Sequence, residues 1–116
     1  MLNHQLTQVF HALADPTRRA IVERLILGEA PVSELAKPLA MSLAAVVQHV
    51  QILEQSGLIL TRKSGRVRTC RIEPETLREA ESWLAQRRLL WEGRLDRLGD
   101  VLSEQIKNEL SAKEDP

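Results

Sequence analysis

Five cationic side chains fall within fifteen consecutive residues of the chain. Residues 58–72 contain Arg62, Lys63, Arg66, Arg68 and Arg71 and no acidic residue, although the whole chain has a formal net charge of zero. A local positive potential attracts a polyanion even when the total charge is small. We therefore predict that Arg62, Lys63, Arg66 and Arg68 contact phosphates of double-stranded DNA or enter its minor groove. The alternative is a charged segment that serves solubility alone.

A second group of residues carries side chains that could read base edges. The predicted outward side of a helix from Ser42 to about Ser56 presents Ser42, Ala44, Ala45, Gln48, His49 and Gln51. A Gln side chain pairs with the adenine edge through two hydrogen bonds, and Ala contacts the thymine methyl group. We predict that Gln48 is the principal base reader and that Ser42 and Gln51 lie nearer phosphates. The alternatives are a solvated polar face for Gln48 and a packed position at the helix edge for His49.

The spacing of apolar residues predicts the helices that position these side chains. A first helix ends near Leu13, and Asp15 and Pro16 are suited to begin a second one as N-cap and first helical residue. A short helix follows over about 32–39, and a tight turn leads to the helix that Ser42 caps. Two helices joined by such a turn form a helix-turn-helix. On the second, third and fourth of these helices, the predicted core positions are Ile21, Val22, Leu25, Ile26, Leu35, Val46, Val50 and Leu53.

The cationic segment itself is predicted to be a β-hairpin. Residues 58–63 and 66–72 are rich in β-branched residues and flank a Ser64-Gly65 turn. A basic hairpin directly after a helix-turn-helix is a wing. The predicted fold class is therefore mainly α (α+β), a winged helix-turn-helix with the order α-α-α-α-β-β-α.

A long helix is predicted from Glu75 to about Ile106. Leu77, Leu84, Trp91 and Leu98 recur at a spacing of seven residues, and Leu95 and Leu102 extend the same stripe. A domain of this size cannot bury the whole stripe, so we expect it to pack against a second copy of the chain. The predicted dimer interface comprises Leu6, Phe10, Leu84, Trp91, Leu95, Leu98 and Leu102. We predict one domain over residues 1–110 and a disordered tail over 111–116.

Several classes of protein are disfavoured by what the sequence lacks. It has no Gly-rich phosphate loop, metal-ligand motif or nucleophile signature, so we expect no enzyme, no metal site and no cofactor. The single cysteine, Cys70, cannot form an internal disulfide, and we expect it to be a small buried residue rather than a redox switch. No signal peptide and no apolar run of membrane-spanning length are apparent, which favours the cytoplasm.

Three segments together resemble the ArsR-type winged-helix regulators. Residues 10–19 (FHALADPTRR) are similar to the opening signature of that family, residues 32–36 (VSELA) to its positioning helix, and residues 42–58 to its recognition helix and exit. The resemblance covers about residues 6–102. It implies a homodimeric transcription regulator that acts as a repressor at a near-palindromic operator.

The chain departs from the family pattern in two respects. Its recognition segment, residues 42–56, contains no Lys or Arg, whereas family members often carry one near Gln48. The founding members sense metals through a cysteine pair at the places of Ala36 and Pro38, so the resemblance implies the branch that does not sense metals. A winged-helix module for protein contacts alone, or a PadR- or MarR-type regulator, stays open as an alternative. The sequence does not indicate an effector.

Overall fold

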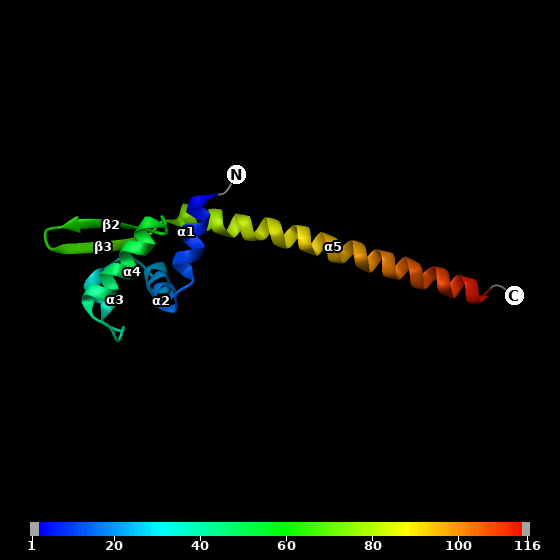
Figure 1. Cartoon of the computed structure of the whole chain (residues 1–116), viewed down its shortest axis with the longest axis horizontal. Coiled ribbons are helices and arrows are strands. Elements are labelled where there is room, and N and C mark those ends of the chain that lie inside the picture. Colours follow the sequence, from blue (N-terminus) through cyan, green and yellow to red (C-terminus); the bar gives the residue numbers. More distant parts are fainter. Residues whose placement is uncertain (1–2, 115–116) are drawn as a thin grey trace. The chain divides into compact units, whose positions relative to one another are not determined.

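The computed structural model of the chain describes residues 3–114. The chain divides into two compact units, and the boundary in the sequence falls after Ala80. The elements follow in the order α1 (His4–Leu13), α2 (Pro16–Ile26), β1 (Ala30–Pro31), α3 (Val32–Ala36), α4 (Leu43–Gln55), β2 (Ile59–Ser64), β3 (Val67–Ile72) and α5 (Pro74–Glu114) (Figure 1). This order confirms the predicted winged helix-turn-helix and adds one strand, β1. The single domain expected over residues 1–110 stays a prediction.

The two predicted N-caps start their helices as expected. The Asp15 carboxylate accepts a hydrogen bond from the backbone N–H of Arg18 at 3.1 Å, and Pro16 is the first residue of α2. The Ser42 hydroxyl oxygen accepts from the backbone N–H of Ala45 at 3.2 Å. Each cap satisfies a donor that the first turn of a helix leaves without an intrahelical partner. The start of the recognition helix is therefore fixed by the sequence itself.

The core of the first unit lies between α1, α2, α3, α4 and the sheet. Most predicted core positions are confirmed: Ile21, Leu25, Leu35, Val46, Val50 and Leu53 are at most 3% exposed, and Val22 is 6% exposed. Ile26 is an exception, because it is the last residue of α2 and 62% exposed. The apolar stripe of α2 thus ends one residue earlier than the periodicity predicted.

The hairpin belongs to a three-stranded antiparallel sheet with the order β1–β3–β2. Ala30 and Pro31 of β1 pair with Cys70 and Thr69 of β3. A strand of two residues carries no alternating pattern, so periodicity could not reveal it. Pro31 is tolerated there because β1 is an edge strand, where the missing N–H breaks no ladder.

The second unit is formed by residues 81–114 of α5. The helix passes through Gly93 and Gly99 without interruption, and it includes residues 111–114, where a disordered tail was predicted. No proline interrupts this stretch before Pro116, which is compatible with a continuing helix. The rest of the predicted tail, residues 115–116, lies outside the described residues. Among residues 3–114, no helix combines the length and the apolar character that a bilayer crossing requires.

Candidate nucleic-acid interface

The solvent-facing side of α4 carries most of the side chains predicted to read DNA. Ala44, Gln48 and Gln51 are exposed, and Ala45 is half-buried beside them. The opposite side of the helix contributes Val46, Val50 and Leu53 to the core. This division follows from the helical period, since residues three and four apart share a face. α4 is therefore a core helix with one free polar face.

Ser42 has two roles available to one hydroxyl group. Its oxygen accepts the hydrogen bond that caps α4, and its hydrogen remains free to be donated. The backbone N–H groups of the first turn of α4 point along the helix axis, out of its N-terminal end. Such an end favours an anion through the helix dipole and its unpaired donors.

The hairpin presents its cations on both faces. Antiparallel partners share a face, so the pair Lys63 and Arg68 lies on one side of the hairpin and Arg62, opposite Thr69, on the other. Arg62, Lys63, Arg66 and Arg68 are all exposed. The Nη1 group of Arg68 donates to the Thr61 hydroxyl at 3.4 Å. The four predicted phosphate contacts are thus accessible and lie on one hairpin.

The hairpin runs back along α4 from the end of that helix toward its start. The Thr61 hydroxyl donates to the Glu54 carboxylate near the C-terminus of α4. At the other end, a cavity of about 230 Å³ is lined by Leu43 and Val47 of α4, by Pro31, Val32 and Ser33, and by Arg66, Val67 and Arg68 of the hairpin. The cationic tip of the hairpin therefore lies beside the first turns of α4.

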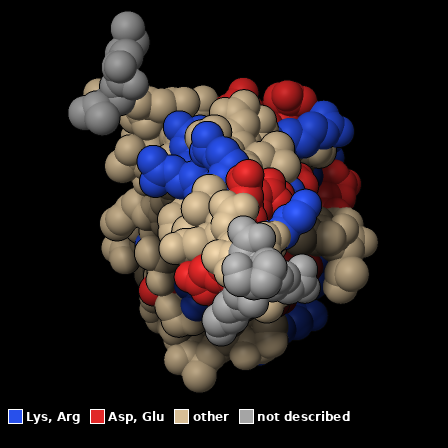
Figure 2. Space-filling model, turned by 90° about the vertical axis from the view of Figure 1, so that its right-hand side faces the viewer, with Lys and Arg blue, Asp and Glu red and all other residues tan. Residues whose placement is uncertain are grey.

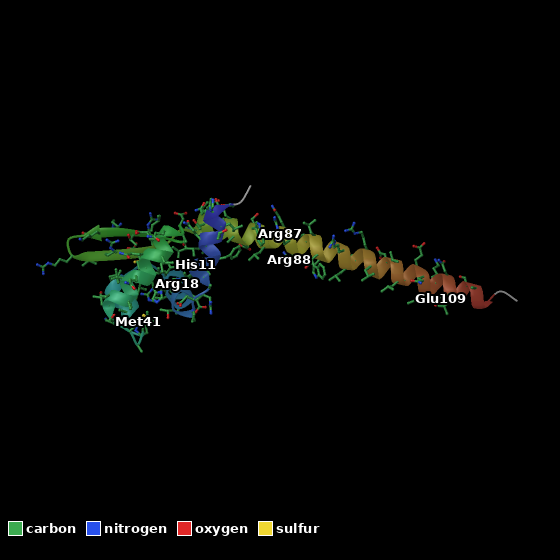
Figure 3. The ribbon with its side chains drawn as sticks, viewed as in Figure 1. His11, Arg18, Met41, Arg87, Arg88 and Glu109 are labelled. Carbon is green, nitrogen blue, oxygen red and sulfur yellow. The ribbon has the colours of Figure 1, made fainter. Side chains whose placement is uncertain are left out.

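A buried guanidinium group joins α1, α2 and α4. Arg18 of α2 is 8% exposed, and its Nε and Nη2 groups donate to the carbonyl oxygens of Ala12 (2.7 Å) and His11 (3.1 Å) at the end of α1. Its Nη1 lies 3.3 Å from Nδ1 of His49 on α4. Figure 3 labels Arg18 and His11, which lie near each other in this part of the molecule. Helices end with unpaired carbonyls, and here an arginine from the next helix satisfies them.

His49 lies at the edge of α4 rather than in the middle of its outward face. Its side chain is 21% exposed, and its Nδ1 lies 4.0 Å from a carboxylate oxygen of Asp15. The pKa of the Asp15 carboxyl is lowered, mainly by the backbone N–H of Arg18 that hydrogen-bonds to it and to a lesser extent by electrostatic interaction with the neighbouring side chains. The edge position agrees with the alternative considered for this histidine.

The predicted dimer residues fall into two groups. Leu84, Trp91, Leu95, Leu98 and Leu102 on the second unit are each 50–59% exposed, whereas Leu6 packs against the core of the first unit and Phe10 is half-buried. The five residues of α5 lie along one side of the helix, since their spacing is seven, four, three and four. We call these five residues the α5 stripe.

Charges of both signs are mixed on one face of the molecule. Figure 2 shows this face, where Lys and Arg are interspersed with Asp and Glu among other residues.

Cys70 is buried in the sheet, as predicted. Its side chain is 0% exposed, and burial raises the pKa of its thiol from 9.0 to about 11. Among residues 3–114, no three His, Cys, Asp or Glu side chains gather closely enough to hold a metal ion.

Sequence reasoning missed two features of this surface. The first is the structural role of Arg18, although the Asp-Pro-Thr-Arg run indicated a helix start with an arginine in its first turn. The second is a pair of exposed apolar side chains, Leu43 (56%) and Val67 (51%), at the cavity between α4 and the hairpin. Neither apolar residue breaks a pattern in the sequence, so no signal there could have identified it.

The sequence of the chain is similar to those of known transcriptional regulators. A family model described as a helix-turn-helix domain matches residues 13–62. The HTH-type transcriptional regulator Rv2034 of Mycobacterium tuberculosis is 44% identical over 70 residues, which are 60% of this chain and 65% of that protein. The transcriptional repressor SdpR of Bacillus subtilis is 27% identical over 79 residues, 68% of this chain and 88% of that protein. The chain thus matches slightly less than two thirds of the mycobacterial regulator.

Solved structures agree with the sequence matches. The crystal structure of an ArsR family transcriptional regulator superposes with a TM-score of 0.75 and 53% identity, covering 79% of this chain and 95% of that one. An ArsR-like regulator from Rhodococcus sp. RHA1 superposes with a TM-score of 0.73 and 30% identity, covering 84% and 92%. Such regulators are not enzymes, in agreement with the prediction from the sequence. By its sequence and its fold, the chain is a member of the ArsR family of winged helix-turn-helix transcription regulators.

Proposed function

We propose that this regulator binds operator DNA as a homodimer, with α4 in the major groove and the hairpin on the flanking backbone. The observation that carries the proposal is the juxtaposition of an exposed polar helix face with a hairpin that holds five cations and no acid. An α-helix fits the major groove, and cations beside it neutralise phosphates. Gln48 is the base reader, and Ser42, Gln51, Arg62, Lys63, Arg66 and Arg68 contact or approach the backbone.

The second copy is needed for geometric reasons. The α5 stripe exposes five large apolar side chains, and a contiguous patch of this kind marks an interaction surface. A two-fold pair sets its recognition helices about 34 Å apart, which is one turn of DNA. The operator is therefore near-palindromic. One structural relative, from Mycobacterium bovis, is described as a homodimeric winged helix-turn-helix DNA-binding domain, at 26% identity and a TM-score of 0.58.

We further propose that the protein is a cytoplasmic repressor that does not sense metals. The relatives include a protein named as a transcriptional repressor, and an operator-bound dimer blocks a promoter by occupying it. Ala36 and Pro38 carry no metal-binding side chain, which supports the assignment to the branch without a metal sensor.

One experiment tests the site, its symmetry and its spacing together. Purified protein is used to select bound sequences from random duplex DNA, and the mass of the free protein is measured by sedimentation equilibrium. We expect a dimer and an enriched inverted repeat with half-sites about 10 base pairs apart. Affinity should fall steeply with salt, with a log–log slope of roughly −5 for about six phosphate contacts. A monomer, or no enrichment at low ionic strength, would overturn the proposal.

A second candidate function is a winged-helix module that binds proteins and not DNA. The absence of Lys and Arg from residues 42–56 favours it. The cationic hairpin opposes it, because five cations with no acid give a positive potential that attracts a polyanion, whereas the centre of a protein–protein interface is depleted of charged residues. The same selection experiment separates the two, since a protein-binding module enriches no DNA sequence.

A further inference from the structure

The contact between Arg18 and His49 has a chemical consequence for the recognition helix. The guanidinium group is held in place by its two hydrogen bonds to the end of α1, at 2.7 and 3.1 Å, and it is nearly inaccessible to solvent. Its third interacting nitrogen, Nη1, lies 3.3 Å from Nδ1 of His49. A fixed donor group therefore faces one nitrogen of a histidine on α4.

Two groups lie near Nδ1 of His49: the Arg18 guanidinium at 3.3 Å, which can only donate a hydrogen bond, and a carboxylate oxygen of Asp15 at 4.0 Å, which can only accept one. Only the guanidinium lies within hydrogen-bond distance. Nδ1 of the neutral ring therefore accepts from Arg18, and the ring hydrogen resides on Nε2. In proteins, the partner of one ring nitrogen commonly selects the tautomer in this way.

The other ring nitrogen is not buried. Within the described residues, His49 makes its hydrogen bond through Nδ1, and no buried side-chain nitrogen or oxygen lacks a partner. Since no described residue hydrogen-bonds Nε2, that atom cannot be buried. The side chain as a whole is 21% exposed. An N–H donor is thus presented at the surface from the edge of α4, one residue after Gln48.

We propose that Arg18 is a positioning residue, which orients His49 as an Nε2–H donor to a phosphate oxygen at the edge of the major groove. This inference rests on the DNA-binding function proposed above. We expect the acceptor to be a phosphate and not a base. His49 lies beside α2 at the edge of the outward face of α4, whereas a base reader would lie at the middle of that face. A hydrogen bond to a charged acceptor is about twice as strong as one between neutral groups.

Two substitutions of His49 separate the roles of its two nitrogens. Asn places an amide oxygen near the position of Nδ1, so His49→Asn keeps an acceptor for Arg18 and loses the outward donor. Gln places an amide nitrogen near the position of Nε2, so His49→Gln keeps the outward donor. We expect His49→Asn to bind the selected operator about tenfold more weakly, and His49→Gln to retain more of the affinity. Discrimination between single-base operator variants should not change, because a phosphate carries no sequence information.

The role of Arg18 is tested on the free protein, without DNA. Two-bond ¹H–¹⁵N correlation spectra distinguish the two neutral tautomers of histidine. We expect His49 to be in the Nε2–H form in the wild type and in a mixture of tautomers in Arg18→Met, which removes the donor. Arg19→Met is the matched control, since Arg19 donates to the carbonyl of Leu13 at 2.8 Å and does not contact His49; its spectrum should match the wild type.

The outcomes are distinguishable from those of the proposed function. A wild type that binds no duplex overturns DNA binding itself. A wild type that binds DNA, with His49→Asn equally tight or with altered base preference, overturns the phosphate contact alone. An Nδ1–H form in the wild type, or an unchanged tautomer in a folded Arg18→Met, overturns the positioning role.

Discussion

Lys63 and Arg68 lie directly opposite each other in the β2–β3 ladder, and both side chains are exposed. Two like charges at such a pair destabilise a hairpin, whereas opposite charges stabilise it by about 0.2–1 kcal/mol. No acidic residue in segment 58–72 compensates for this repulsion. The arrangement is unfavourable for the free protein and becomes favourable when a polyanion lies against the hairpin.

A charge reversal at this pair should therefore change stability and DNA affinity in opposite directions. Lys63→Glu is expected to raise the free energy of unfolding by up to about 1 kcal/mol and to weaken operator binding. The slope of log affinity against log salt should become less steep by about 2 in a dimer, one phosphate contact per subunit. Urea unfolding and a binding titration at several salt concentrations measure both effects. A variant that binds as tightly as the wild type would show that Lys63 does not contact DNA.

Gln48 is predicted to set base preference. Gln48→Ala should reduce discrimination at one base pair of each half-site by about 1–3 kcal/mol, because a paired hydrogen bond to a base edge is lost. Binding to a panel of single-base operator variants is the measurement. Gln55→Ala is the matched control, since Gln55 is also exposed on α4 but lies in its last turn. Unchanged discrimination in Gln48→Ala would remove this assignment.

The α5 stripe is predicted to hold the dimer together. Leu98→Glu should dissociate the dimer, since it places a charge in an apolar interface, and operator affinity should fall as a consequence. Leu89→Glu is the control: Leu89 is 60% exposed, close to the 55% of Leu98, but it lies on the opposite side of the helix. Sedimentation equilibrium should show a monomer for the first variant and a dimer for the second. A dimer in both cases would place the interface elsewhere.

Asp15 is predicted to make stability depend on acid. Its folded-state pKa is lowered, chiefly by the Arg18 backbone N–H, so its contribution is present above the unfolded pKa near 3.8 and is lost as pH falls through the lower folded value. Asp15→Asn retains a good N-cap and should show a shallower loss of stability below pH 4 than the wild type. Asp15→Ala should lower the free energy of unfolding at neutral pH, because the N-cap of α2 is lost. Urea unfolding at pH 7 and in the range 3–4 checks both; equal slopes for wild type and Asp15→Asn would contradict the prediction.

Cys70 is predicted to be unreactive in the folded protein. Its thiol is inaccessible and its pKa is about 11, so at pH 8 it is neutral, and the thiolate is the reactive form. A thiol-specific disulfide reagent should react with it only as fast as the protein unfolds, and at once in urea. Because the folded pKa exceeds the unfolded one, the free energy of unfolding should also decrease as pH rises above 9. Rapid reaction of the native protein would indicate that the sheet opens around Cys70.

The sequence by itself determined the elements and their order, because the signals for them are local. The caps Asp15 and Ser42, the helical period of Val46, Val50 and Leu53, and the turn at Ser64-Gly65 each act within a few residues. The cationic composition of segment 58–72 is likewise visible without any structure.

The tertiary structure alone decided which distant residues meet. The contact of Arg18 with His49, 31 positions apart in the chain, depends on how α2 and α4 pack. The pairing of the two-residue strand β1 with β3, and the place of Leu43 and Val67 on the wall of one cavity, are likewise set by the tertiary structure. The spacing of apolar residues predicts which side of an element is buried. It does not predict what that side contacts, because contacts between elements depend on their packing in three dimensions.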